Sequence, residues 1–238
     1  MTYFTVARLT MRTLFGRRRF LLLLPLPGLV VGLALLAESL GATAEEWGAP
    51  VLVGLGFAVV LPVLALIVGA SVLGSEIEDG TAVHVLSKPL ARSIIVLSKL
   101  VVSVAVTTMA VGAGMVLAGL IAGDLRLAFG LLVGTAVGAV AYSAFFVALS
   151  LLTRRPVLVG LLYILVWEGL LGNLVSGTRV LSIQQYVVTV AERVGDTSLF
   201  TGTVSLPVAI GMAAAITLAA TALAVDRLRS FALTGETS

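Results

Sequence analysis

The sequence predicts an all-α polytopic membrane protein with six transmembrane helices, an N-terminal amphipathic interfacial helix and a short cytoplasmic helix. Three observations support this prediction. Of the 238 residues, 59% are hydrophobic and only 11% are charged, whereas a soluble domain carries about 25% charged residues. Six apolar stretches are each about long enough to cross a bilayer. The basic residues gather in segments that would lie on one side of the membrane.

The first 19 residues predict an interfacial helix followed by a basic turn. Phe4, Ala7 and Met11 share one helical face, and Arg8 lies on the opposite face. A helix of this kind lies in the membrane surface with its apolar side facing the lipid. Three consecutive arginines at 17–19 then precede the first apolar stretch.

The six spans are apolar runs bounded by polar or turn-forming residues, and together they form a single transmembrane domain over residues 1–238. Pro62 predicts a kink in the second span, and Pro156 opens the fifth at a first-turn position that tolerates proline. The predicted spans are residues 20–37, 50–73, 100–122, 127–152, 157–174 and 207–225, with a cytoplasmic loop at 75–99 and an extracytoplasmic segment at 176–205.

The distribution of basic residues predicts that both termini lie in the cytoplasm. With the N terminus inside, 12 of the 15 basic residues are cytoplasmic, and only Arg126, Arg179 and Arg193 lie outside. This is the asymmetry that orients membrane proteins, and it explains the basic composition without a nucleic-acid partner. The preference for Ala, Gly, Val, Leu and Arg suggests a GC-rich bacterial genome, so we expect the bacterial cytoplasmic membrane.

The sequence argues against an enzyme. The chain has no cysteine and one histidine, His84, which excludes a thiolate metal site and a histidine-based one. It contains no G-x-x-x-x-G-K-[ST] phosphate loop. We therefore expect no catalytic residue, metal or cofactor in this chain.

A row of glycines in the fourth span predicts a close helix contact. Gly130, Gly134 and Gly138 recur every fourth residue, so they share one face of a helix. Small residues at this spacing let a neighbouring backbone approach closely. Whether that neighbour belongs to this chain or to a second copy stays open.

Glu168 is the only acidic residue well inside a predicted span. An ionised carboxylate is costly there, so we expect it to face the bundle interior and to be protonated or paired. It can line a substrate path or gate, or it can fix helix packing, and the sequence favours neither.

The extracytoplasmic segment predicts one amphipathic helix. Ser182 and Gln185 fit the S-x-x-Q capping box, and the apolar residues that follow share a face opposite Glu192 and Arg193. This helix can lie on the membrane surface, dip into it, or form a soluble cap.

The loop between the second and third spans resembles the first cytoplasmic loop of type-2 ATP-binding-cassette (ABC-2) permeases. It reads E-I-E-D-G-T-A-V-H-V-L-S-K-P-L-A-R-S-I-I-V-L-S-K over 76–99. The strings W-E-G at 167–169 and L-S-I-Q-Q at 181–185 also look like members of this family that have separate ATPase subunits. The positions that match the loop pattern are Glu76, Glu78, Gly80, Thr81, Leu86, Ser87, Pro89, Arg92 and Lys99.

The resemblance implies the permease subunit of an ABC exporter, with this loop docking into a cytoplasmic ATPase. Gly80 can end the second helix and Thr81 can cap a short coupling helix at 82–86. The implied partners are two ATP-binding subunits, which hold ATP and Mg²⁺, and a second copy or a paralogue of the permease. The alternatives are a non-transporting transducer that moves an extracytoplasmic partner, and an ATP-independent carrier or channel.

Overall fold

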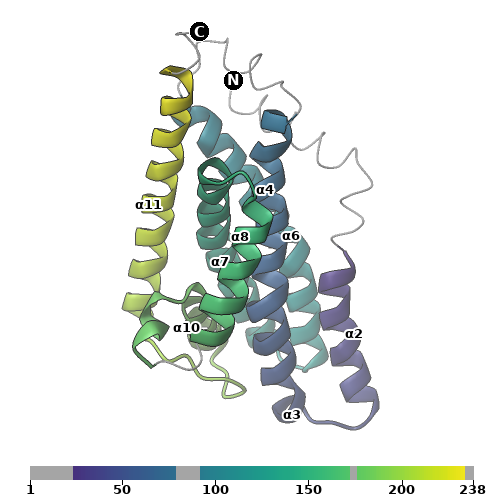
Figure 1. Ribbon diagram of the computed structural model, residues 1–238. Helices are drawn as coiled ribbons and strands as arrows, with labels where there is room; N and C mark the ends of the chain where they lie inside the picture. Colours follow the sequence, from purple (N-terminus) through teal and green to yellow (C-terminus); the bar gives the residue numbers. More distant parts are fainter. Residues whose placement is uncertain (1–23, 79–91, 172–175, 234–238) are drawn as a thin grey trace.

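The computed structural model describes residues 24–78, 92–171 and 176–233, and it is 88% helical, without strands in this part of the chain. Figure 1 shows a bundle of long, roughly parallel helices. The all-α prediction is confirmed. The elements are α2 (Pro25–Ser39), α3 (Ala44–Gly48), η1 (Ala49–Val60), α4 (Leu61–Glu78), α6 (Arg92–Ile121), α7 (Leu125–Leu152), α8 (Pro156–Leu162), η2 (Tyr163–Leu171), η3 (Ser176–Leu181), α10 (Ile183–Gly195) and α11 (Leu206–Leu233).

Four helical stretches in the described residues are long and apolar enough to cross a membrane: Ala44–Ser71, Ser93–Ile121, Leu125–Leu152 and Leu206–Leu228. Two shorter apolar helices, Pro25–Ser39 and Pro156–Leu170, occupy the other two predicted spans. The count of six spans therefore stays a prediction. The predicted interfacial helix before residue 20 and the coupling helix at 82–86 lie outside the described residues.

Helix α7 is the centre of the bundle. It packs against α4, α6, α10 and α11, and 67% of its most apolar stretch is buried, against 22% for α11 at the edge. Since α7 touches most of the other long helices, it connects the two ends of the molecule. We refer to the end that carries α3 and α10 as the α10 end (Figure 1).

The second predicted span is more irregular than a proline kink. It is π-helical over Ala49–Val60 and becomes α-helical at Leu61. The change falls at Pro62, which has no backbone N–H to donate to the residue four positions earlier, so the regular α pattern is interrupted there. A second π-helical segment, η2, follows α8 and contacts η1.

The third long helix includes residues ahead of the predicted apolar span. We placed the start of the span at Leu100, but α6 begins at Arg92. Ile95 and Val96 are buried against α7 and α11, and Ser98 donates its hydroxyl hydrogen to the Ile95 carbonyl oxygen at 2.9 Å. Tertiary packing thus covers the first turns of α6, which come before the apolar span.

The architecture can be tested by labelling single cysteines introduced into this cysteine-free chain. Thr43 lies just before α3, and Ser198 lies close to it, since Gly48 at the end of α3 packs against Leu199. Cysteines at Thr43 and Ser198 should therefore react with a membrane-impermeant maleimide from the same side, and a cysteine at Ser87 only from the opposite side. Labelling of Ser87 and Thr43 from one side would contradict the arrangement.

Candidate functional site

A buried hydrogen-bond network surrounds the Glu168 carboxylate. Glu168 lies in η2 and is 1% exposed. Its Oε1 accepts hydrogen bonds from the hydroxyls of Tyr142 and Tyr163, each at 3.1 Å, and from the backbone N–H of Ile183 at 3.0 Å. The hydroxyl of Ser182 donates to Oε2. The carboxylate is thus satisfied by four donors inside the bundle.

These donors come from three separate elements. Tyr142 lies in α7, Tyr163 begins η2, and Ser182 and Ile183 form the start of α10. The Ile183 amide is one of the N–H groups that a helix leaves without an internal partner, and an acidic group at this end of a helix is electrostatically favourable. Glu168 therefore acts as a long-range cap that holds α10 against the bundle.

The capping box predicted at Ser182 is half formed. The Ser182 hydroxyl oxygen accepts from the Gln185 backbone N–H at 3.4 Å. The Gln185 side chain does not return to Ser182; its Oε1 accepts from the Thr203 hydroxyl at 2.8 Å. A complete box forms instead at α3, where the backbone N–H of Thr43 donates to Glu46 Oε2 at 2.9 Å.

Aromatic rings enclose the network. The ring centroids of Phe145 and Tyr163 are 4.5 Å apart, and those of Tyr142 and Phe146 are 5.9 Å apart in a stacked arrangement. These apolar faces exclude water from the carboxylate, which strengthens its hydrogen bonds.

Further bonds tie η3 to its neighbours. The indole N–H of Trp167 donates to the Leu181 carbonyl oxygen at 3.4 Å, and the Tyr186 hydroxyl donates to the Val180 carbonyl oxygen. Burial, followed by the nearby Glu168 carboxylate, raises the pKa of Tyr186 to about 12. Its hydroxyl therefore stays protonated and remains a donor throughout the physiological pH range.

The glycine row lies on the face of α7 that contacts α10. A Cβ added at Gly130 would lie 2.5 Å from the Ala191 carbonyl oxygen, and one at Gly134 would lie 2.9 Å from that of Val187. A Cβ at Gly138 would meet the side chains of Leu61 and Val187 at 2.6 Å. The neighbour that approaches these glycines is α10 of the same chain.

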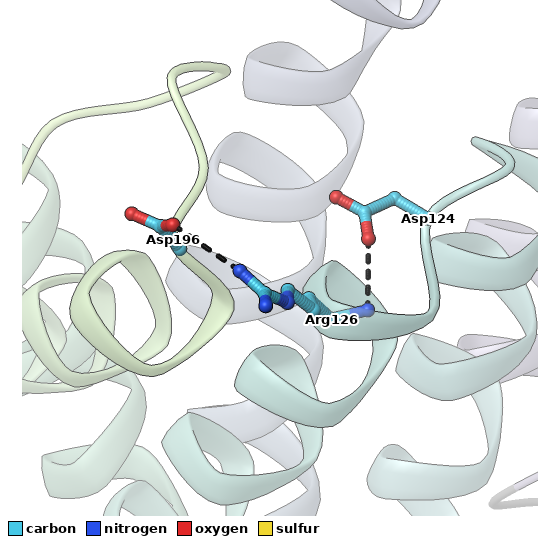
Figure 2. A network of polar contacts seen from close by, with 3 residues as sticks. All are labelled: Asp124, Arg126 and Asp196. Atoms are coloured by element: carbon cyan, nitrogen blue, oxygen red, sulfur yellow. Dashed lines mark hydrogen bonds and ion pairs between the residues drawn. The ribbon is translucent and has the colours of Figure 1, made fainter.

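The predicted amphipathic outer helix is packed across the end of the bundle. Nine of the thirteen residues of α10 are buried, and the helix contacts both α7 and α11. At the C terminus of α10, Asp196 adopts a left-handed conformation. Its carboxylate oxygen Oδ2 forms an exposed ion pair with the Arg126 guanidinium at 3.5 Å (Figure 2). Asp124 caps α7 by accepting from the Arg126 backbone N–H at 2.8 Å. An exposed pair contributes only about 0–1 kcal/mol, so burial rather than charge holds α10.

The residues of the loop motif are only partly described. Glu76 and Glu78 belong to the last turn of α4, and Arg92 begins α6; these two helix ends lie together, opposite the α10 end (Figure 1). The positions between them, Gly80, Thr81, Leu86, Ser87 and Pro89, are outside the described residues.

Lys99 is buried, unlike the position that the resemblance implies, and its coupling role stays a prediction. The resemblance places it with the residues that face the ATPase, but its side chain is 1% exposed inside the bundle. It belongs to a buried polar stripe on α6 with Ser103 and Thr107, four residues apart, and Ser103 donates to the Ser143 hydroxyl of α7 at 3.1 Å. The sequence analysis missed this stripe, although the four-residue spacing of its polar residues was visible.

Glu168 lines neither the cleft that includes Arg179 and Gln184 nor the one that includes Arg126 and Asp196. The geometry thus gives this carboxylate a clear role in joining helices, and a role in a substrate path stays a prediction. The described residues contain no group of three or more His, Asp or Glu residues that could hold a metal ion.

One comparison with known proteins identifies a family. A family model described as ABC-2 family transporter protein matches residues 26–225, from the start of α2 to the last turns of α11. No curated protein matches the chain.

The structural importance of Glu168 can be measured by substitution. Glu168→Leu removes the acceptor for four donors, and each buried group left unpaired costs about 1–3 kcal/mol. We expect Glu168→Leu to lower the midpoint of thermal unfolding of the purified protein by a large amount. Glu168→Gln, which keeps one oxygen acceptor, should lower the midpoint less. Tyr163→Phe, which removes one donor, should lower the midpoint least of the three variants. A Glu168→Leu protein as stable as wild type would show that the network does not hold the bundle.

The contact between α7 and α10 predicts opposite effects of two glycine-to-alanine changes. Gly134→Ala places a Cβ against α10, and overpacking of this kind costs about 1–3 kcal/mol. Gly28→Ala in α2 meets nothing within 4 Å and should be neutral or stabilising by up to about 1 kcal/mol through helix propensity. Thermal unfolding of both proteins in the same detergent checks the difference. Equal midpoints would refute the close packing of α10.

Proposed function

The chain belongs to the ABC-2 family of transporter proteins, and we propose that it is the membrane-spanning permease subunit of an ATP-driven exporter. The family match carries this proposal. The loop motif at 76–99, which lies within the matched residues, supports it further, because it joins α4 to α6 at the end where a cytoplasmic ATPase would dock in this proposal.

In this proposal the ATPase pushes on the ends of α4 and α6. Both helices pack along α7, and packed helices move as stiff bodies rather than deforming continuously. α7 in turn carries α10 through its glycine row and through Tyr142. A stroke at one end would therefore be transmitted by α7 to the network at the other end.

The partners follow from the family. Two ATP-binding subunits would hold ATP and Mg²⁺, and a second permease copy or a paralogue would complete the membrane domain. The permease would carry out no hydrolysis itself. ATP changes the state of the membrane domain only to the extent that it binds one state of the complex more tightly than the other.

The other two functions have less support. A non-transporting transducer would be favoured by an exposed helix at 182–194, whereas α10 is largely buried. An ATP-independent carrier would be favoured by inverted repeats with broken helices at matching positions. The sequence shows no clear inverted repeat of this kind.

The coupling role of the loop is tested by reversing its charges. Removing one member of a buried interfacial charge pair costs roughly 2–5 kcal/mol, whereas exposed charges without a partner contribute about 0–1 kcal/mol. Glu78→Lys and Arg92→Glu should therefore release the ATPase subunit during co-purification, or keep the complex but uncouple ATP hydrolysis from transport in liposomes.

The matched controls are Glu45→Lys and Arg193→Glu, which reverse exposed charges at the α10 end. They should leave assembly, hydrolysis and coupling unchanged. If the double reversal at Glu78 and Arg92 behaves like these controls, the loop is not the coupling element.

A further inference from the structure

A cleft of about 480 Å³ lies at the α10 end of the bundle. Its volume is within the range of roughly 300–1,000 Å³ that is typical of small-molecule sites. The cleft is bounded by η1, η3, the start of α10 and the segment that follows residue 199. It is separate from the loop at 76–99 and from Glu168, so the functions discussed above do not account for it.

One side of the cleft carries hydrogen-bond donors and a positive charge. Arg179 of η3 is half-exposed and makes no ion pair within the described residues. Gln184, which also lines the cleft, is only 6% exposed. Its side-chain amide N–H groups are donors that can bind a polar group in the cleft.

The charge of the lining is positive. No acidic residue lines the cleft, and the nearest element that contributes a carboxylate, α10, directs Glu192 to the backbone N–H of Gly202 at 2.7 Å. The first amide of α10 is already taken by Glu168. An anion would therefore be recognised by the side chains of Arg179 and Gln184 rather than by the end of the helix.

The part of the lining that η1 contributes is apolar. It consists of Ala49, Val53, Gly54 and Ala58 on the first turns of η1. A Cβ added at Gly54 would have no neighbour closer than 3.9 Å, so space remains beside this face. Because η1 is the start of an apolar helix long enough to span the membrane, the wall continues from the polar end toward the lipid.

We propose that this cleft binds an anionic amphiphile, with its phosphate or carboxylate head at Arg179 and Gln184 and its hydrocarbon chain along η1. A single half-exposed cation in water holds a small anion weakly, because salt screens the attraction. The apolar wall supplies the additional affinity by burying methylene groups. This combination selects a membrane-derived ligand over a free anion.

The test uses the whole chain purified alone in a non-ionic detergent, without an ATPase, so that its outcome is independent of ATP coupling. Binding of oleoyl lysophosphatidic acid is measured by native mass spectrometry. We expect binding at least tenfold tighter than that of oleoyl lysophosphatidylcholine, which has the same chain but a zwitterionic head. Inorganic phosphate at the same concentration should not compete. Equal binding of the two lipids, or full competition by phosphate, would overturn the proposal.

Variants locate the site. Arg179→Gln together with Gln184→Leu should weaken lysophosphatidic acid binding at least tenfold, whereas Arg193→Gln, an exposed basic residue outside the cleft, should not change it. Gly54→Leu should weaken binding by filling the apolar side. Its control, Gly32→Leu in α2, also enters open space and should bind as wild type does. Unchanged binding in both cleft variants would place the ligand elsewhere.

Discussion

A carboxylate buried among apolar helices has to be surrounded by donors, and the α10 end of this protein is organised around that requirement. Glu168 receives hydrogen bonds from α7, from its own segment and from the first turn of α10. In hydrocarbon an unsatisfied polar group is far more costly than in water, so these three elements cannot separate without a large penalty. Together with the burial of nine α10 residues, this side chain fixes the start of α10, and the glycine row of α7 permits the close approach.

The two ends of the bundle differ in physical character. At the α10 end, hydrogen bonds fix short elements in place, namely Trp167 to η3, Tyr186 to Val180, and Gln185 to Thr203. At the other end, small alanines of α11, Ala220 and Ala224, pack against apolar side chains of α6 and α7. An apolar contact can slide, whereas a hydrogen-bonded network has defined alternatives.

Irregular helices are concentrated in the same region. The π-helical segments η1 and η2 contact each other, and η2 carries Glu168. π-helical geometry is rare and is often found at functional sites. Here it accompanies the carboxylate network on one side and the apolar wall of the cleft on the other. The local irregularity thus coincides with the polar chemistry of the membrane domain.

The sequence alone determined the features that depend on composition and short-range chemistry. Hydropathy identified the apolar helices, and charge placed Glu168 in a bundle interior. Spacing identified the glycine row, and Ser182 marked the start of α10.

The sequence could not determine which helices contact one another. In a membrane, helices are apolar on every side, so hydropathy does not reveal the buried face. Only the tertiary structure decided that α10 covers the glycines, that Tyr142, 26 residues away, reaches Glu168, and that Lys99 is buried. Each of these depends on contacts between residues distant in the chain, which no local pattern encodes.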